Sequence, residues 1–184
     1  MATVSGWLAT MATETGMTTD EYVAQVLPMY IPPIVPNRYR HLLSEVLSRL
    51  PADWDAARNW QVEVSSEQTP RGYASARHED EADGEIEQMW IMTLYPSLLD
   101  RLSDKACLYV IAHEFGHIAS GLYGPSLVNK GIGYAPAKGT ANQYEEVVST
   151  GNQEDIAEKL ALEWGFSPEL QAFFRDESGS SSST

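Results

Sequence analysis

The chain has 184 residues, the size of one domain that forms a single hydrophobic core without disulfide bonds or other cross-links. Acidic residues outnumber basic residues by 26 to 12, and the formal charge of -14 repels nucleic-acid phosphates and anionic lipids, so we expect neither nucleic acid nor membrane as a partner. Cys107 is the single cysteine, which excludes an internal disulfide, and no segment has the roughly 20 consecutive apolar residues of a transmembrane helix. No signal peptide is recognisable either, so we expect a cytoplasmic protein.

The N-terminal third is expected to contain two helices and two irregular segments. Residues 1–18 are rich in Thr, Ala, Gly and Met without clear periodicity, which favours a flexible arm. A short helix is predicted from about residue 19 to Pro28, and the further prolines up to residue 36 favour an extended segment. Residues 37–50 carry apolar side chains at helical spacing, which predicts an amphipathic helix that the next proline ends.

The hydrophobic period changes from helical to alternating in the middle of the chain, which indicates β-strands. The predicted strands are residues 59–66, 72–79 and 85–95. The third strand is apolar on both faces from Met89 to Leu94, as expected for a strand that is covered on both sides. We therefore expect a small mixed or antiparallel sheet of about three to four strands packed against a helix.

Two helices are predicted in the C-terminal half. The first covers residues 102–121 and the second covers residues 152–165, with a long loop rich in Gly and Pro between them. Residues 176–184 are rich in Ser and are expected to form a disordered tail. Together these elements predict an α+β fold, with a single domain over residues 19–175.

The sequence HEFGH at residues 113–117 lies in the first of these two helices and has the chemistry of a zinc site. His113 and His117 are four residues apart, so their rings lie one above the other on the helix and can bind one metal ion. Glu114 lies about 100° round the helix, where its carboxylate can contact a metal-bound water and act as a general base. Gly116 costs about 1 kcal/mol relative to alanine inside a helix, which indicates a close neighbour on that face.

The third ligand has to come from another segment. A catalytic zinc usually has three protein ligands, and because no histidine follows His117 the third must be a carboxylate. Glu154 and Glu158 share one face of the last helix, so one can bind the metal while the other supports a ligand histidine. Glu154 is the preferred ligand. The remaining candidates are Asp155, which points about 100° away from that face, Glu145 and Glu146.

At these residues the chain resembles the gluzincin metallopeptidases. HEFGH matches their HExxH motif, and EDIAEKLA at residues 154–161 is similar to their downstream ExxA[DE]xxA helix. The order of strands, HExxH helix and ligand helix is similar to ImmA/IrrE-type and minimal-gluzincin peptidases. The resemblance implies a zincin-like fold, with a sheet packed on the active-site helix and further helices at both ends. The roles that it implies are His113, His117 and Glu154 as Zn2+ ligands, Glu114 as the base, and Glu158 as the carboxylate that supports a ligand histidine.

The implied activity is hydrolysis of a peptide bond in a peptide or protein substrate, with Glu114 transferring the proton of a zinc-activated water. The oxyanion also needs a stabilising side chain from another segment. Tyr134 is the preferred catalytic residue for this role. The alternatives are Tyr123, Tyr144 and His78. The strand at residues 86–94 is expected to hold an extended substrate by edge pairing.

Two other interpretations apply to the same residues. His113 and His117 can be core histidines of a protein that binds no metal, because HExxH arises by chance in roughly one in a few hundred chains of this length. Alternatively, the chain binds zinc and acts as a regulatory or binding module with little turnover. Glu114 argues against that second interpretation, since a pure scaffold does not need a base. Cys107 is expected to be a small core side chain.

Overall fold

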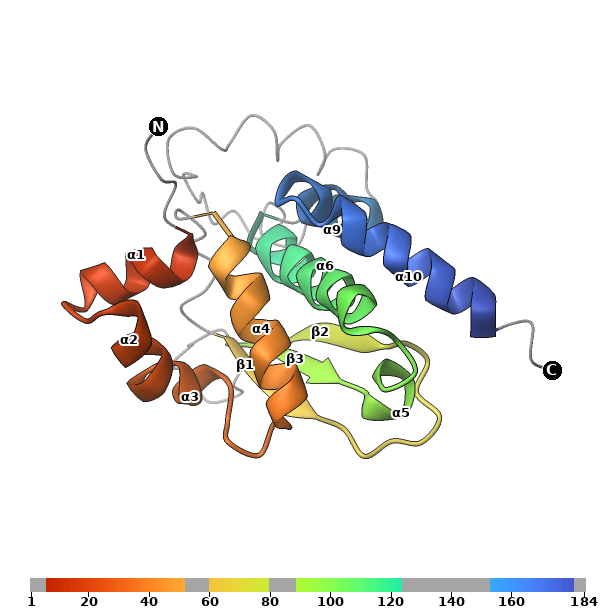
Figure 1. The fold of residues 1–184 in the computed structure, drawn as a ribbon, viewed down its shortest axis with the longest axis horizontal. Coiled ribbons are helices and arrows are strands. Elements are labelled where there is room, and N and C mark those ends of the chain that lie inside the picture. Colours follow the sequence, from red (N-terminus) through yellow and green to blue (C-terminus); the bar gives the residue numbers. More distant parts are fainter. Residues whose placement is uncertain (1–5, 52–59, 80–88, 124–152, 181–184) are drawn as a thin grey trace.

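The computed structural model describes residues 6–51, 60–79, 89–123 and 153–180 (Figure 1). The elements in chain order are α1 (Trp7–Glu14), α2 (Thr19–Gln25), α3 (Leu27–Tyr30), α4 (Asn37–Arg49), β1 (Trp60–Val64), β2 (Ala74–Glu79), β3 (Met89–Leu94), α5 (Pro96–Leu99), α6 (Asp104–Tyr123), α9 (Gln153–Glu163) and α10 (Ser167–Ser180). Helices and a mixed three-stranded sheet together confirm the predicted α+β class. Within the described ranges, no helix is both long enough and apolar enough to span a bilayer.

Helix α1 is part of the domain, so the expectation of a flexible arm over residues 1–18 is wrong for this segment. Trp7 is 1% exposed, and its ring lies 6.5 Å from the ring of Trp60 on β1. Gly6, directly before the helix, lies so close to α4 that a Cβ there would be 2.0 Å from the carbonyl oxygen of Ser48. Burying a tryptophan removes a large apolar surface from water, which holds this segment against the core.

The proline-rich segment begins with a short helix and is not extended throughout. Pro28 lies in the first turn of α3, where its missing N–H and fixed φ are tolerated. Before it, Thr18 and Glu21 exchange side-chain and backbone hydrogen bonds in a capping box that begins α2. Helix α4 confirms the predicted amphipathic helix. Its buried side chains are Tyr39, Leu42, Leu43, Val46 and Leu47.

Strand β3 is the central strand of the sheet. It pairs in parallel with β1 and antiparallel with β2, so both of its edges are occupied. The expectation that residues 86–94 offer a free edge to a substrate is therefore wrong, and among the described strands β1 and β2 lie at the edges. One face of the sheet packs on the helices, where Trp60 contacts Phe115 of α6 edge-on at 5.1 Å. On the sheet, Glu63 accepts hydrogen bonds from Arg77 and Thr93, each at 2.7 Å, across all three strands.

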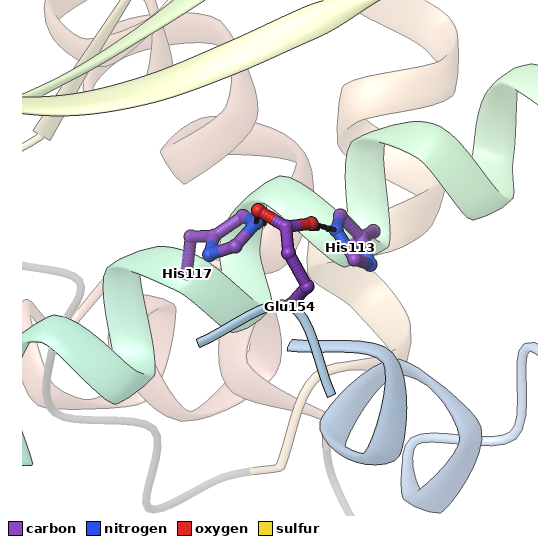
Figure 2. A group of neighbouring side chains, drawn as sticks. All are labelled: His113, His117 and Glu154. Carbon is purple, nitrogen blue, oxygen red and sulfur yellow. Dashed lines mark hydrogen bonds and ion pairs between the residues drawn. The ribbon is translucent and has the colours of Figure 1, made fainter. Parts of the chain in front are cut away.

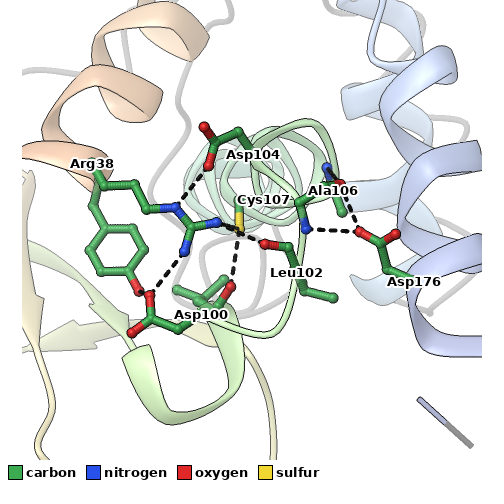
Figure 3. A network of polar contacts seen from close by, with 10 residues as sticks. Arg38, Asp100, Leu102, Asp104, Ala106, Cys107 and Asp176 are labelled. Atoms are coloured by element: carbon green, nitrogen blue, oxygen red, sulfur yellow. Dashed lines mark hydrogen bonds and ion pairs between the residues drawn. The ribbon is translucent and has the colours of Figure 1, made fainter. Parts of the chain in front are cut away.

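Helix α6 is the centre of the fold, and it contacts α4, α9, α10 and β2 (Figure 1). Arg38 of α4 fixes the turn before α6, as Figure 3 shows. Its guanidinium donates to Asp104 at 2.8 Å, to Asp100 at 2.9 Å and to the carbonyl oxygen of Leu102 at 2.8 Å. Asp100 also accepts from the hydroxyl of Tyr39 at 2.6 Å. These contacts set where the helix with the HEFGH sequence begins.

Helix α10 was not expected from the sequence. It runs to Ser180, so the expected tail at residues 176–184 is helical over the part that the structure describes. Asp176 of α10 accepts hydrogen bonds from the backbone N–H of Ser103 at 2.9 Å and from its hydroxyl at 2.7 Å. The Ser103 hydroxyl in turn accepts from the N–H of Ala106, so α10 contributes to the N-terminal cap of α6.

Candidate metal centre

The two helices that carry the predicted ligands pack at very short range. A Cβ built on Gly116 of α6 would lie 2.6 Å from the carbonyl oxygen and 2.8 Å from the Cα of Ala157 on α9. This explains the glycine inside a helix, because a larger side chain would push the two backbones apart. The close approach brings the first turn of α9, with Glu154, over the histidines of α6.

His113, His117 and Glu154 converge on one point between α6 and α9 (Figure 2). The Nε2 atoms of the two histidines are 3.1 Å apart, and the Glu154 carboxylate oxygens lie 3.1 Å from His113 Nε2 and 3.4 Å from His117 Nε2. In a tetrahedral zinc site with bonds of about 2.0–2.1 Å, neighbouring ligand atoms lie about 3.3–3.4 Å apart. The two Glu154 distances involve different oxygens, Oε2 for His113 and Oε1 for His117, and the three side chains lie close enough together to hold one metal ion.

The protonation state of His117 also suits metal binding. Burial lowers the pKa of His117, the neighbouring His113 lowers it further, and Glu154 opposes both effects. A neutral imidazole is the form that binds a metal. The other ring nitrogen of His113, Nδ1, is buried and has no hydrogen-bond partner among the described residues. Two imidazoles and a carboxylate make a donor set that fits zinc.

Glu114 lies beside this cluster without belonging to it. The side chain is 7% exposed, and burial together with the charge of Glu154 raises the pKa of its carboxyl to about 8. A hydrogen bond with the backbone of Ala76 on β2 acts in the opposite direction. A carboxyl whose pKa lies near neutrality can both accept and return a proton. The role of Glu114 as a base stays a prediction.

Glu158 lies outside the group of possible ligands, and its carboxylate lies near the hydroxyl of Tyr109. Its support of a ligand histidine stays a prediction. Sequence reasoning overlooked Tyr109, although it lies four residues before His113 on the same stripe of α6. That spacing was the available signal. Asp155 is exposed and is not part of the group either.

The remaining candidates are not placed. Tyr134, Tyr144, Glu145 and Glu146 lie outside the described residues. Tyr123 belongs to α6 and His78 to β2, but the positions of their side chains are also outside the described part of the chain. The stabiliser of the oxyanion therefore stays a prediction.

Cys107 is a core residue, as expected. It is fully buried, its thiol donates to the carbonyl oxygen of Leu99 at 3.4 Å, and Arg38 contacts its sulfur from α4 (Figure 3). Burial raises the pKa of the thiol to about 11, although the charge of Arg38 opposes this. A thiol in this state is not a nucleophile at neutral pH.

No protein family, no curated protein and no solved structure matches the chain in comparisons of sequence and fold. The resemblance to gluzincins thus rests on the residues of the two motifs. The structure supports it to the extent that His113, His117 and Glu154 form a group that can hold a metal ion.

Proposed function

We propose that the protein is a zinc-dependent peptidase with its active centre at His113, His117 and Glu154. The observation that carries the proposal is the convergence of two imidazole nitrogens and one carboxylate oxygen within 4.8 Å, with the buried carboxyl of Glu114 beside them. Catalytic zinc sites commonly use three such protein ligands and leave a fourth position for water or substrate. A structural zinc site would instead be closed by four protein ligands.

Zinc held by these ligands would supply a Lewis acid and lower the pKa of bound water toward neutrality. Glu114 accepts the proton of the attacking water at its carboxylate and delivers it to the leaving amine. The backbone of Ala76 on β2 lies near this carboxyl and favours its charged form, the form that accepts a proton. The burial of Glu114 keeps competing water away from the base.

The substrate is a peptide in extended conformation. Strand β2 pairs with β3 along one edge, lies at the edge of the described sheet, and contacts α6. It also touches the base through Ala76. An extended peptide that pairs with the outer edge of β2 would present its backbone carbonyl groups to the cluster. Strand β2 thus replaces residues 86–94 as the proposed substrate-binding strand.

The test compares wild type with Glu114→Gln and with the control Glu163→Gln, an exposed glutamate on α9. Bound zinc is measured by elemental mass spectrometry, and cleavage of a peptide library by mass spectrometry of the products. We expect about one zinc per chain in all three proteins, and a loss of cleavage of at least about a hundredfold in Glu114→Gln alone.

The outcomes separate the competing functions. Stoichiometric zinc without cleavage in either wild type or Glu114→Gln would favour the regulatory or binding module. Absence of zinc from freshly purified wild type, with no uptake on addition of zinc, would contradict the metal site and leave His113 and His117 as core histidines.

A further inference from the structure

Tyr109 extends the ligand stripe of α6 by one turn, and the proposed chemistry does not use it. Its side chain is 6% exposed. The ring centroid lies 5.9 Å from that of His113, at an interplanar angle of 45°, and 5.6 Å from that of Phe173 on α10. The Tyr109 ring is therefore enclosed between a proposed metal ligand and the C-terminal helix.

The hydroxyl of Tyr109 reaches the helix that carries the third ligand. It lies near the carboxylate of Glu158, which is one turn after Glu154 on the same face of α9. Burial and the charge of Glu158 raise the pKa of Tyr109. Two carboxylates at this spacing repel each other, and a neutral hydroxyl dipole near one of them reduces that repulsion.

The orientation of His113 needs an explanation that Glu158 does not provide. A metal-binding histidine usually donates its second ring N–H to a carboxylate, a carbonyl group or water, which fixes the ring. Nδ1 of His113 is buried without a partner among the described residues, so Glu158 does not bond to it. On this side of the ring packing contributes the orientation, and Tyr109 is the aromatic neighbour one turn before His113 on α6.

We infer that Tyr109 is a positioning residue of the metal centre: its ring fixes the orientation of His113, and its hydroxyl ties Glu158, and with it the start of α9, to α6. The inference rests on the metal site of the proposed function, but not on peptide hydrolysis. It assigns to one tyrosine the support that the sequence assigned to Glu158. Tyr109 acts on His113 and on Glu154 through α9, and does not bind the metal.

The experiment measures zinc affinity by competition with a chromophoric chelator, and ligand geometry by the visible absorption spectrum after substitution with Co2+. Tyr109→Phe removes the hydroxyl, and we expect roughly three- to tenfold weaker zinc binding. Tyr109→Leu also removes the ring, and we expect about 10- to 100-fold weaker binding and an altered Co2+ spectrum.

Tyr73→Phe is the matched control. The hydroxyl of Tyr73 donates to Glu177 at 3.2 Å, and its ring packs on Phe173 at 5.4 Å. Tyr73→Phe therefore removes a tyrosine hydroxyl beside a glutamate from another ring that packs on Phe173, and leaves the surroundings of His113 unchanged. We expect wild-type zinc affinity in Tyr73→Phe. Glu158→Ala should weaken zinc binding in the wild type but have no further effect in the Tyr109→Phe background, because both changes remove the same interaction between the hydroxyl and the carboxylate.

The inference is overturned if folded Tyr109→Leu binds zinc as tightly as wild type with an unchanged Co2+ spectrum, or if Tyr73→Phe weakens zinc binding equally. Wild type that takes up no metal would refute the metal site and this inference together. Wild type that binds zinc but cleaves no peptide would refute the proposed function alone, and the affinities of the Tyr109 variants would still decide the positioning role.

Discussion

Gly116→Ala perturbs the candidate centre without changing any of its polar groups. The added Cβ would lie 2.6 Å from the carbonyl oxygen of Ala157, whereas ordinary contacts begin near 3.4 Å, so α9 has to move outward by about 0.8 Å. A metal site tolerates ligand displacements of only about 0.2 Å, and Glu154 lies on the segment that moves. We expect zinc affinity to fall by about 10- to 100-fold, as for other losses of ligand support.

The stability of the metal-free protein should change much less. Overpacking costs about 1–3 kcal/mol, and the higher helix propensity of alanine returns about 1 kcal/mol, so the net loss is about 0–2 kcal/mol. Urea unfolding of the metal-free protein and chelator competition for zinc measure the two quantities separately. Gly179→Ala on α10 is the control, because a Cβ there meets nothing within 4 Å. Wild-type zinc affinity in Gly116→Ala would refute the claim that this contact sets the position of Glu154.

Two further predictions concern the scaffold. Burial raises the pKa of Glu169, but the hydrogen bonds from Arg49 and the backbone, together with the charges of Arg49 and Lys105, lower it overall. Arg49 also packs on Phe166. Arg49→Met should therefore cost about 2–3 kcal/mol at pH 7. A carboxyl whose pKa is lower in the folded than in the unfolded protein stabilises the fold above the unfolded pKa, and this stabilisation is lost as the pH falls through the folded pKa. The free energy lost in Arg49→Met should therefore be smaller at pH 4 than at pH 7 in urea unfolding. An equal loss at both pH values would contradict the prediction. The Cys107 thiol should not react with a disulfide reagent at pH 8 until the protein is unfolded, and rapid labelling of the native protein would show that it is accessible.

Helices whose apolar residues recur at a regular helical spacing could be predicted from the sequence. Helices rich in small, polar or acidic residues could not. Helix α4 and helix α6 carry long apolar stripes, and both form as expected. Helix α1 was not predicted because the Thr, Ala and Gly residues around Trp7 obscure its short row of apolar side chains. Helix α10 was not predicted because its acidic and Ser residues have the composition of a disordered tail. The central position of β3 was not predictable, because pairing order depends on tertiary contacts and not on the alternation within one strand.

The same distinction applies to the candidate site. His113, Glu114 and His117 lie within little more than one helical turn, so their spacing alone fixes their relative positions. Glu154 was found by elimination among the acidic residues, and its approach to the histidines depends on the contact between α6 and α9. The neighbour of Glu158 was not predictable, because the approach of its carboxylate to Tyr109 depends on how α9 packs on α6.

The candidate centre joins a buried base to an exposed ligand. Glu114 is 7% exposed and is held in the core, whereas the side chain of Glu154 is 72% exposed. The apolar face of α9 is buried in the core through Ile156, Leu160 and Ala161. This packing and the close approach of Gly116 to Ala157 hold the first turn of α9, with Glu154, next to α6. A cluster with one exposed ligand meets the need of the proposed peptidase, whose substrate would have to reach the metal from outside.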